Sequence, residues 1–249
     1  MSAERPARRW LAPAREFFSD GPPPIDFQMH TRWTDGQSSV AEMIAAAESA
    51  GLWAIAITEH VNESSAWYPD FVADMKAARQ CCAGLDVYYG AEIAAADYRG
   101  GLKADAARIE ADLVLGVVHR YPKENGGGFW AFDELTARDA VELELRALLG
   151  LTANRHIDVL GHPGGTAFKK FGAFPVEWLE PAFVAARESG MAVELNTKYL
   201  WDAAGMLTLL RRVNPLVSLG SDAHCAADVG GNHALLLRQM DSPQLVQTP

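Results

Sequence analysis

Seven short apolar runs, separated by helical stretches, follow residue 24 and limit the folds that this chain can adopt. Each run is bounded by turn or charged residues, which is typical of strands buried on both faces. Strands that alternate with helices predict a parallel sheet, and seven such units over residues 25–240 predict an α/β barrel. The predicted strands are Ile25–His30, Trp53–Thr58, Asp86–Glu92, Asp112–Val118, Ile157–Gly161, Met191–Asn196 and Leu216–Ser221.

The helical stretches carry boundary signals of their own. Ser39 and Glu42 form a capping-box pattern before a helix predicted over Met43–Ala50. A second helix, over Thr136–Leu149, is predicted to end at Gly150, because glycine is favoured just after a helix.

The barrel is predicted to be a single domain, since no linker or change of composition interrupts residues 25–240. Hydrophobic residues make up 49% of the chain, which is enough to bury a large core. Residues 1–24 are interpreted as a poorly ordered N-terminal arm that ends in a Gly-Pro-Pro-Pro run, and residues 241–249 as a C-terminal tail.

The composition also indicates which partners and which cellular setting the chain is suited to. The formal net charge is −10, and phosphate backbones repel such a chain, so the charge opposes an extended nucleic-acid footprint. The three cysteines, Cys81, Cys82 and Cys225, have neither disulfide-framework nor zinc-finger spacing, which favours a reducing, cytoplasmic setting. No apolar run approaches the roughly 18 residues of a membrane span. The oligomeric state is not indicated.

Side chains that can bind metal ions stand at the ends of six of the seven predicted strands. The carboxyl ends of barrel strands converge on one face, where active sites are built. The donors are nitrogen and oxygen without thiolate, which suits Zn²⁺, Mn²⁺ or Fe²⁺. The candidate ligands are His30, His60, Glu92, His119, His162, Asp222 and His224, with Asp35 in the loop after the first strand.

These donors exceed what one ion needs. Three carboxylates and five histidines are a better fit to two or three ions that a carboxylate bridges. Ions about 3.5–4 Å apart can hold a hydroxide nucleophile and the oxygens of a phosphoryl group together. This chemistry favours phosphoester hydrolysis first and amide hydrolysis second.

Seven segments, in order along the chain, resemble the motifs of the PHP (polymerase and histidinol phosphatase) family over roughly residues 25–235. The resemblance implies a distorted (β/α)₇ TIM-like barrel, a site for two or three divalent metal ions, and hydrolysis of phosphoric esters. The segments are Asp26–Gly36 (DFQMHTRWTDG), Ile57–His60 (ITEH), Gly90–Glu92 (GAE), Val118–His119, Asp158–Pro163 (DVLGHP), Glu194–Asn196 (ELN) and Gly220–His224 (GSDAH).

The resemblance also implies which residues share an ion, with Glu92 common to the first two sets. The three sets are His30, Glu92 and Asp222 with Gln28 beside them; Glu92, His119 and His162; and Asp35, His60 and His224.

Two positions depart from the family pattern. The first motif reads Gln28-Met29-His30, where the family usually has His-x-His. A glutamine carbonyl is a neutral and weaker ligand, so the first ion is expected to be loosely held. Glu59 stands where the family usually has aspartate, and we interpret it as a carboxylate that orients a ligand.

Catalysis also needs proton transfer and positive charge. We expect His224 or Asp222 to move a proton and Arg120, which follows His119, to bind the phosphoryl group. Other cations predicted on the same face are Arg32, Lys123, Lys169, Lys170 and Lys198.

The favoured hypothesis is a metal-dependent phosphoesterase that hydrolyses a small phosphomonoester. A phosphodiesterase or exonuclease acting on nucleotide ends or short nucleic acid stays open. So does a degenerate, non-catalytic metal-binding PHP module, for which Gln28 is the sequence support. An amidohydrolase-type barrel shares the metal chemistry, but it normally has His-x-His on the first strand and often a modified lysine at a strand end.

Overall fold

The computed structural model describes residues 5–124, 126–172 and 174–240. Its strands form one sheet in the order β1-β8-β7-β6-β5-β4-β3-β2, and all neighbours from β2 to β8 are parallel, as predicted. These parallel strands are β2 (Ile25–Asp26), β3 (Ala54–His60), β4 (Asp86–Ala94), β5 (Leu113–Val117), β6 (Val159–Leu160), β7 (Ala192–Asn196) and β8 (Leu216–Gly220).

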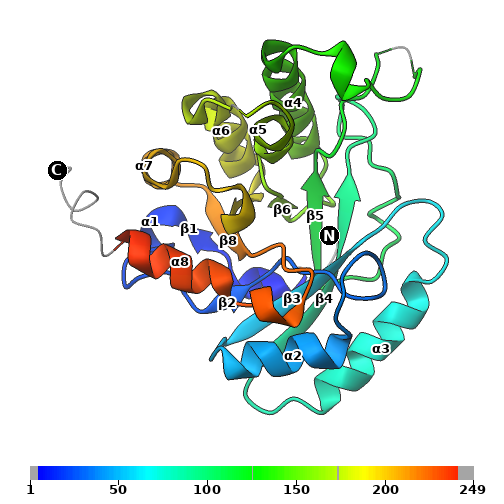
Figure 1. Cartoon of the computed structure of the whole chain (residues 1–249), viewed down its shortest axis with the longest axis vertical. Coiled ribbons are helices and arrows are strands. Elements are labelled where there is room, and N and C mark those ends of the chain that lie inside the picture. Colours follow the sequence, from blue (N-terminus) through cyan, green and yellow to red (C-terminus); the bar gives the residue numbers. More distant parts are fainter. Residues whose placement is uncertain (1–4, 125, 173, 241–249) are drawn as a thin grey trace.

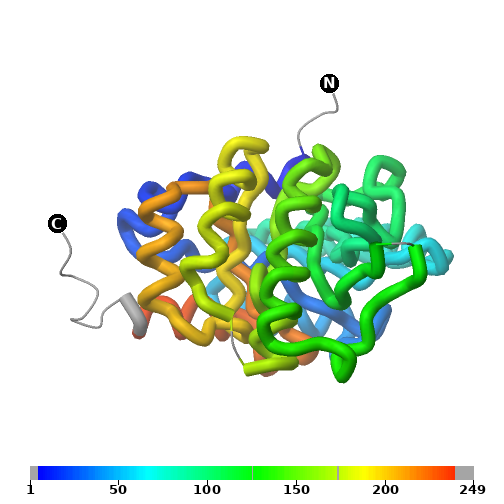
Figure 2. Tube along the Cα trace, turned by 90° about the horizontal axis from the view of Figure 1, so that it is seen from above, coloured from blue at the N-terminus to red at the C-terminus, as the bar shows by residue number. Residues whose placement is uncertain are grey.

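Helices surround the sheet (Figure 1). Helices α2 and α3 pack together on one side, while α4, α6 and α7 stand side by side on another (Figure 2). No helix among the described residues is long and apolar enough to cross a membrane. The α-helices are α1 (Ala14–Phe17), α2 (Val40–Ser49), α3 (Tyr68–Gln80), α4 (Ala137–Thr152), α5 (Gly165–Phe171), α6 (Glu180–Ser189), α7 (Ala203–Val213) and α8 (Gly231–Met240). The 3₁₀ helices are η1 (Pro6–Trp10), η2 (Phe132–Glu134), η3 (Val176–Leu179), η4 (Thr197–Tyr199) and η5 (Ala226–Asp228).

Backbone hydrogen bonds link the continuation of β2 to β8 and its continuation. The Phe27 N–H donates to the Leu219 carbonyl (2.7 Å), and the Asp222 N–H donates to the Gln28 carbonyl (2.9 Å). The first and last parallel strands therefore meet, and the chain forms a distorted TIM-like barrel of seven parallel strands in a single domain. The predicted fold class is confirmed.

Residues 5–24 of the N-terminal arm pack against the barrel, so the expectation of poor order is wrong for these residues. Strand β1 (Ala12–Pro13) pairs antiparallel with β8. Phe17 and Phe18 are buried in the core, and Arg5 forms an ion pair with Asp158 at 2.9 Å. Apolar burial and this ion pair hold the arm against the barrel. The boundary at residue 24 stays a prediction, and the tail over residues 241–249 lies outside the described residues.

The two helix predictions had different outcomes. Ser39 and Glu42 form the expected capping box at the start of α2. Helix α4, however, continues through Gly150 to Thr152, so the predicted end is wrong. A Cβ atom at position 150 would lie 2.5 Å from the Tyr98 carbonyl oxygen. Glycine is needed there because a neighbouring backbone approaches closely, and not because the helix stops.

Candidate metal centre

The carboxyl ends of the parallel strands gather histidines around Glu92, near the end of β4. Its Oε1 atom lies 2.9 Å from His162 Nε2 and 3.3 Å from His119 Nε2. Its Oε2 atom lies 3.5 Å from His30 Nε2 and contacts His60 Nδ1. Only 2% of Glu92 is exposed. One buried carboxylate is therefore surrounded by four imidazoles that come from four different parts of the barrel.

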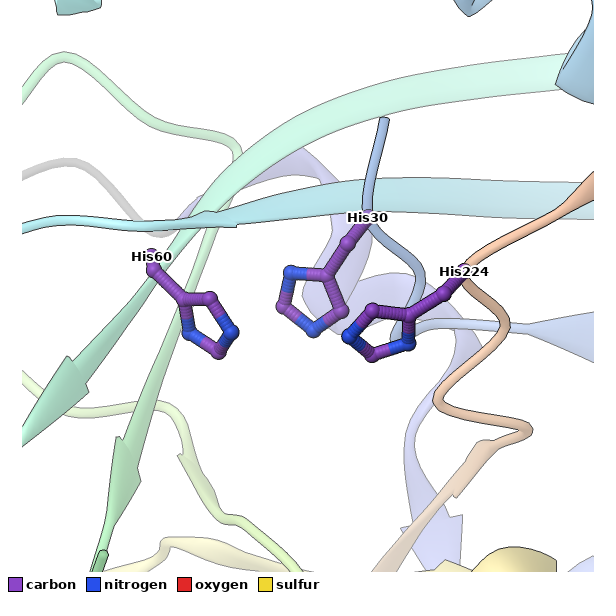
Figure 3. Close-up of side chains that lie close together, drawn as sticks. All are labelled: His30, His60 and His224. Atoms are coloured by element: carbon purple, nitrogen blue, oxygen red, sulfur yellow. The ribbon is translucent and has the colours of Figure 1, made fainter. Parts of the chain in front are cut away.

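Two more carboxylates lie beside this group. Asp222 Oδ1 is 3.2 Å from His30 Nε2, and Asp35 Oδ2 is 3.4 Å from His60 Nε2 and 3.3 Å from His224 Nε2. The imidazoles of His30, His60 and His224 lie close together (Figure 3), with the His30 ring centroid 4.2 Å from that of His60 and 4.7 Å from that of His224. The structure thus brings the three implied ligand sets to one face, and their binding of ions stays a prediction.

Several buried polar atoms in the cluster have no hydrogen-bond partner within the part of the chain that the structure describes. They are both ring nitrogens of His30, Nδ1 of His162 and Oε2 of Glu92. Leaving buried polar atoms without a partner costs free energy. A bound cation would give such nitrogen and oxygen atoms a partner for their lone pairs. Two groups have donor atoms within 4.8 Å of one another: His30, His60 and His224, and His60, Glu92 and His119. The donor set therefore fits divalent metal ions.

The charges in the cluster shift each other's pKa values. Burial raises the pKa of Glu92, but His119 and His60 lower it more, so the net value lies well below the ordinary one. Burial lowers the pKa of His162 and of His60, but Glu92 raises both, to about 9. At neutral pH these two imidazoles hold protons in the metal-free protein. An ion must displace these protons, so its affinity should rise with pH.

Two of the candidate ligands have a strained backbone. His162 has a φ of 26° and Asp222 a φ of 53°, in a region that residues other than glycine seldom adopt. The His162 N–H donates to Glu194 Oε2 at 2.6 Å, and the Asp222 N–H donates to the Gln28 carbonyl at 2.9 Å. These hydrogen bonds hold the strained turns, a feature that is common at functional sites.

Gln28 is fully buried beside Glu92, but its carbonyl oxygen points elsewhere. Its Nε2 donates to Glu92 Oε1 (2.9 Å), and its Oε1 accepts from Asn196 Nδ2 (2.7 Å). Asn196 is oriented in turn, because its Oδ1 accepts from the Lys198 backbone N–H (3.0 Å). The side-chain amides of Gln28 and Asn196 therefore have orientations in which every one of these contacts joins a donor to an acceptor. In this arrangement Gln28 orients Glu92, and its carbonyl does not face the ion cluster as expected.

Glu59 is also fully buried, next to His60 in β3. Its Oε1 accepts from the backbone N–H of Thr31 (2.9 Å) and from the Thr31 hydroxyl (2.6 Å), and its Oε2 accepts from the Thr34 hydroxyl. These threonines belong to the loop that carries Asp35. Glu59 therefore fixes this loop. It does not line the cavity described next, so the structure does not place it among the catalytic groups.

A cavity of about 370 Å³ opens over the cluster. Arg120 is not among its lining residues; its guanidinium lies over the Phe132 ring, 5.9 Å from the centroid. The cations at the cavity are lysines instead, and Lys198 Nζ lies 2.9 Å from Asp222 Oδ2. Lys103 also lines the cavity, and no signal in the sequence set it apart. Besides the acidic and histidine ligands, the cavity is lined by Val61, Asn62, Ala94, Lys103, Thr166, Lys169, Lys170, Lys198 and Tyr199.

Known proteins resemble this chain in sequence and in fold. A family model described as the PHP domain matches residues 26–198. The chain belongs to the PHP domain family. The match spans the segments that supply Glu92 and the histidines from His30 to His162.

Relatives of this PHP chain carry phosphatase names. A probable phosphatase of Caldicellulosiruptor bescii is 26% identical over 206 residues, covering 78% of this chain and 76% of the relative. A probable phosphatase of Edwardsiella ictaluri is 27% identical over 232 residues, covering 88% and 86%. A crystal structure of the histidinol phosphate phosphatase of Lactococcus lactis subsp. lactis, with zinc, L-histidinol and phosphate, has a TM-score of 0.66 at 17% identity, covering 87% of this chain and 93% of that chain. This last likeness shows that the fold is shared.

Proposed function

We propose that this PHP phosphoesterase hydrolyses a small phosphomonoester with the help of two or three divalent ions. The observation that carries the proposal is the convergence of four imidazoles on the buried carboxylate of Glu92, beside Asp222. The phosphatase names of the relatives support the reaction class. The cavity of about 370 Å³ is of a size that suits a small molecule.

Divalent ions bound here would neutralise phosphoryl charge and lower the pKa of the attacking water. The side chains around them have separate tasks. Lys198, which lies 2.9 Å from Asp222 Oδ2, places an ammonium group where it can bind a phosphoryl oxygen. Thr166 and Tyr199 add polar side chains to the wall of the cavity.

We propose His224, in preference to Asp222, as the proton carrier, in which case its Nε2 is not available as an ion ligand. His224 Nδ1 donates to the Asp222 carbonyl oxygen at 2.8 Å, so the lone pair of the ring is on Nε2, the nitrogen nearer Asp35. Burial raises the pKa of Asp222, but the His30 imidazole, whose Nε2 lies 3.2 Å from Asp222 Oδ1, lowers it more, so the net pKa is below the ordinary value. Asp222 therefore stays ionised, which suits an ion ligand better than a proton carrier.

The test is substitution within the cluster. His119→Ala and Asp222→Asn are each expected to lower kcat by about 100-fold or more on an aryl phosphate assayed with Mn²⁺ or Zn²⁺. His233→Ala is the matched control, because its ring lies in α8 with Nε2 3.0 Å from the Pro22 carbonyl oxygen. Circular dichroism checks that each variant is folded. Full activity in both cluster variants would reject the site.

A further inference from the structure

The chain's lysines gather at the cavity over the candidate metal centre. The chain has six lysines and sixteen arginines. Four of the lysines line this cavity, and none of the arginines does so among the described residues. The other two, Lys76 and Lys123, form ion pairs with Glu110 and Glu134. In a chain of net charge −10, this concentration indicates that the cavity binds an anion.

Three of the four cavity lysines have no carboxylate partner among the described residues, whereas Lys198 pairs with Asp222. Their ammonium groups lie over aromatic rings instead, and such contacts orient a cation without neutralising its charge. The contacts are Lys103 over Phe129 (4.5 Å to the centroid), Lys169 over Tyr199 (5.6 Å) and Lys170 over Phe132 (5.1 Å).

The acidic groups of the cavity already contact side chains other than Lys103, Lys169 and Lys170. Asp35, Glu92 and Asp222 all contact histidines of the cluster, and Asp222 also contacts Lys198. Three positive charges therefore remain around the cavity before any divalent ion is counted. A phosphoryl group carries about −1.5 to −2 at neutral pH. Since the ion cluster and Lys198 would take up that charge, the three remaining ammonium groups have no anion to bind in a substrate with a single phosphate.

We propose that the substrate carries a second anionic group, a phosphate or a carboxylate remote from the phosphoryl group that is cleaved, and that Lys103, Lys169 and Lys170 bind it. This inference rests on the proposed function, because it assigns a second anchor in the same site. Like charges repel, so a phosphomonoester with an ammonium group at this position is disfavoured. The chain would therefore differ in substrate preference from a phosphatase whose leaving group carries an amine.

The test uses three phosphonates, whose carbon–phosphorus bond resists hydrolysis, so that binding is measured without turnover. Propylphosphonate has one anionic group, propane-1,3-diphosphonate has two, and 3-aminopropylphosphonate has one anionic group and one ammonium. Each is titrated calorimetrically into the Mn²⁺-loaded protein. The diphosphonate is expected to bind about tenfold more tightly than propylphosphonate, and the amino compound more weakly than propylphosphonate. The advantage of the diphosphonate should shrink as salt is added.

Variants assign this advantage to particular lysines. Lys103→Met, Lys169→Met and Lys170→Met together should reduce the preference for the diphosphonate to about threefold or less. Lys123→Met is the matched control, because its ammonium also lies over an aromatic ring, 4.7 Å from the centroid of Trp130, but pairs with Glu134. It should keep the full preference. Any removal of Mn²⁺ by the diphosphonate affects all variants alike, so it does not alter the comparison.

The outcomes separate this inference from the function on which it rests. Equal affinity of the unmodified protein for propylphosphonate and the diphosphonate would overturn the inference, and so would an undiminished preference in the triple variant. If an aryl phosphate is hydrolysed while either of these results holds, the phosphatase function stands and only the second anchor is lost. If neither phosphonate binds and no aryl phosphate is hydrolysed, both fail.

Discussion

Gln28 departs from the His-x-His pattern expected for the first motif, and both ends of its amide are engaged, with Glu92 and Asn196. Gln28→Leu removes a donor from Glu92 and an acceptor from Asn196 while keeping a similar side-chain volume. We expect this change to weaken Mn²⁺ binding about 10- to 100-fold, because groups that orient a ligand contribute that much to metal affinity. Calorimetry gives the affinity, and elemental analysis should show an unchanged number of ions.

Asn196→Leu is the companion variant. It should weaken binding by a smaller factor, because Gln28 keeps its hydrogen bond to Glu92. Combining the two changes should cost less than the sum of their separate effects, as expected for residues in one network. Loss of exactly one bound ion in Gln28→Leu would contradict this arrangement and show that the glutamine carbonyl is itself a ligand.

The sequence predicts where some side chains of the site lie, but not how others are oriented. Histidines at strand ends were predictable, because parallel strands necessarily deliver their carboxyl ends to one face. The orientation of Gln28 was not, because it depends on Asn196, which lies 168 residues away in the sequence. Arg120, expected to bind the phosphoryl group, does not line the cavity, and its sequence position did not indicate this. Its neighbour His119 points into the site, while its own side chain lies over Phe132.

Helix α5 carries two of the cavity lysines, and a buried carboxylate holds its first turn. Glu144 of α4, 1% exposed, accepts hydrogen bonds from the N–H groups of Thr166 (3.2 Å) and Ala167 (2.6 Å) and from the Tyr121 hydroxyl (3.0 Å). Burial raises the pKa of Glu144 from 4.5 to about 7, although these hydrogen bonds lower it. A charge on this carboxylate is therefore costly, and the cost depends on pH.

The sign of this dependence can be tested with Glu144→Gln. Between pH 4.5 and about 7 the folded protein holds a proton on Glu144 that the unfolded chain has released. The free energy of unfolding therefore falls as pH rises through this window, by up to about 3 kcal/mol from this group. The glutamine variant should lack this contribution, so its free energy of unfolding should depend less on pH. Urea unfolding of metal-free protein at several pH values measures the slope.

Glu142 provides the control for this prediction. It lies on the same helix, but it is half-exposed and pairs with Arg138. Glu142→Gln should therefore keep the pH dependence of the unmodified protein between pH 4.5 and 7. If Glu144→Gln kept it as well, Glu144 would not be the group that titrates in this window.

The elements themselves were predictable where burial leaves a clear pattern. All seven predicted strands are present, because strands covered on both faces read as continuous apolar runs. The missed strand, β1, has two residues, one of them a proline, and a pattern this short carries no periodicity. The predicted end of α4 was wrong because glycine is favoured both just after a helix and where a neighbouring backbone approaches closely. The sequence alone does not distinguish these two cases.

Across the whole molecule, the charge is divided between an acidic chain and a lysine-lined cavity. The net charge of −10 repels long polyanions, while the four cavity lysines attract a small anion that can enter. The two features together favour a compact, strongly anionic substrate over an extended nucleic acid. This balance agrees with a phosphatase that selects its substrate by charge at the cavity as well as by the phosphoryl group.

Removal of metal should destabilise the whole barrel, because the cluster joins several strands. Ions at about 100 times their Kd stabilise a protein by about 2.7 kcal/mol. For a chain of this length that corresponds to a Tm about 5–10 °C higher than after chelation. Differential scanning calorimetry of Mn²⁺-loaded and EDTA-treated protein measures the difference. In Glu92→Gln, which lacks the shared carboxylate, chelation should change the Tm little.

The difference in Tm between the Mn²⁺-loaded and the EDTA-treated protein should also widen as pH rises. In the metal-free protein Glu92 raises the pKa of His60 and of His162 from 6.5 to about 9. Their protonated forms stabilise the metal-free fold fully below pH 6.5, and this stabilisation is lost as pH rises to 9. Over the same range ions compete with fewer protons and bind more tightly. The loss of these protons is what allows the tighter binding, so a difference in Tm that stays constant from pH 6.5 to 9 would show that these imidazoles are not at the ion site.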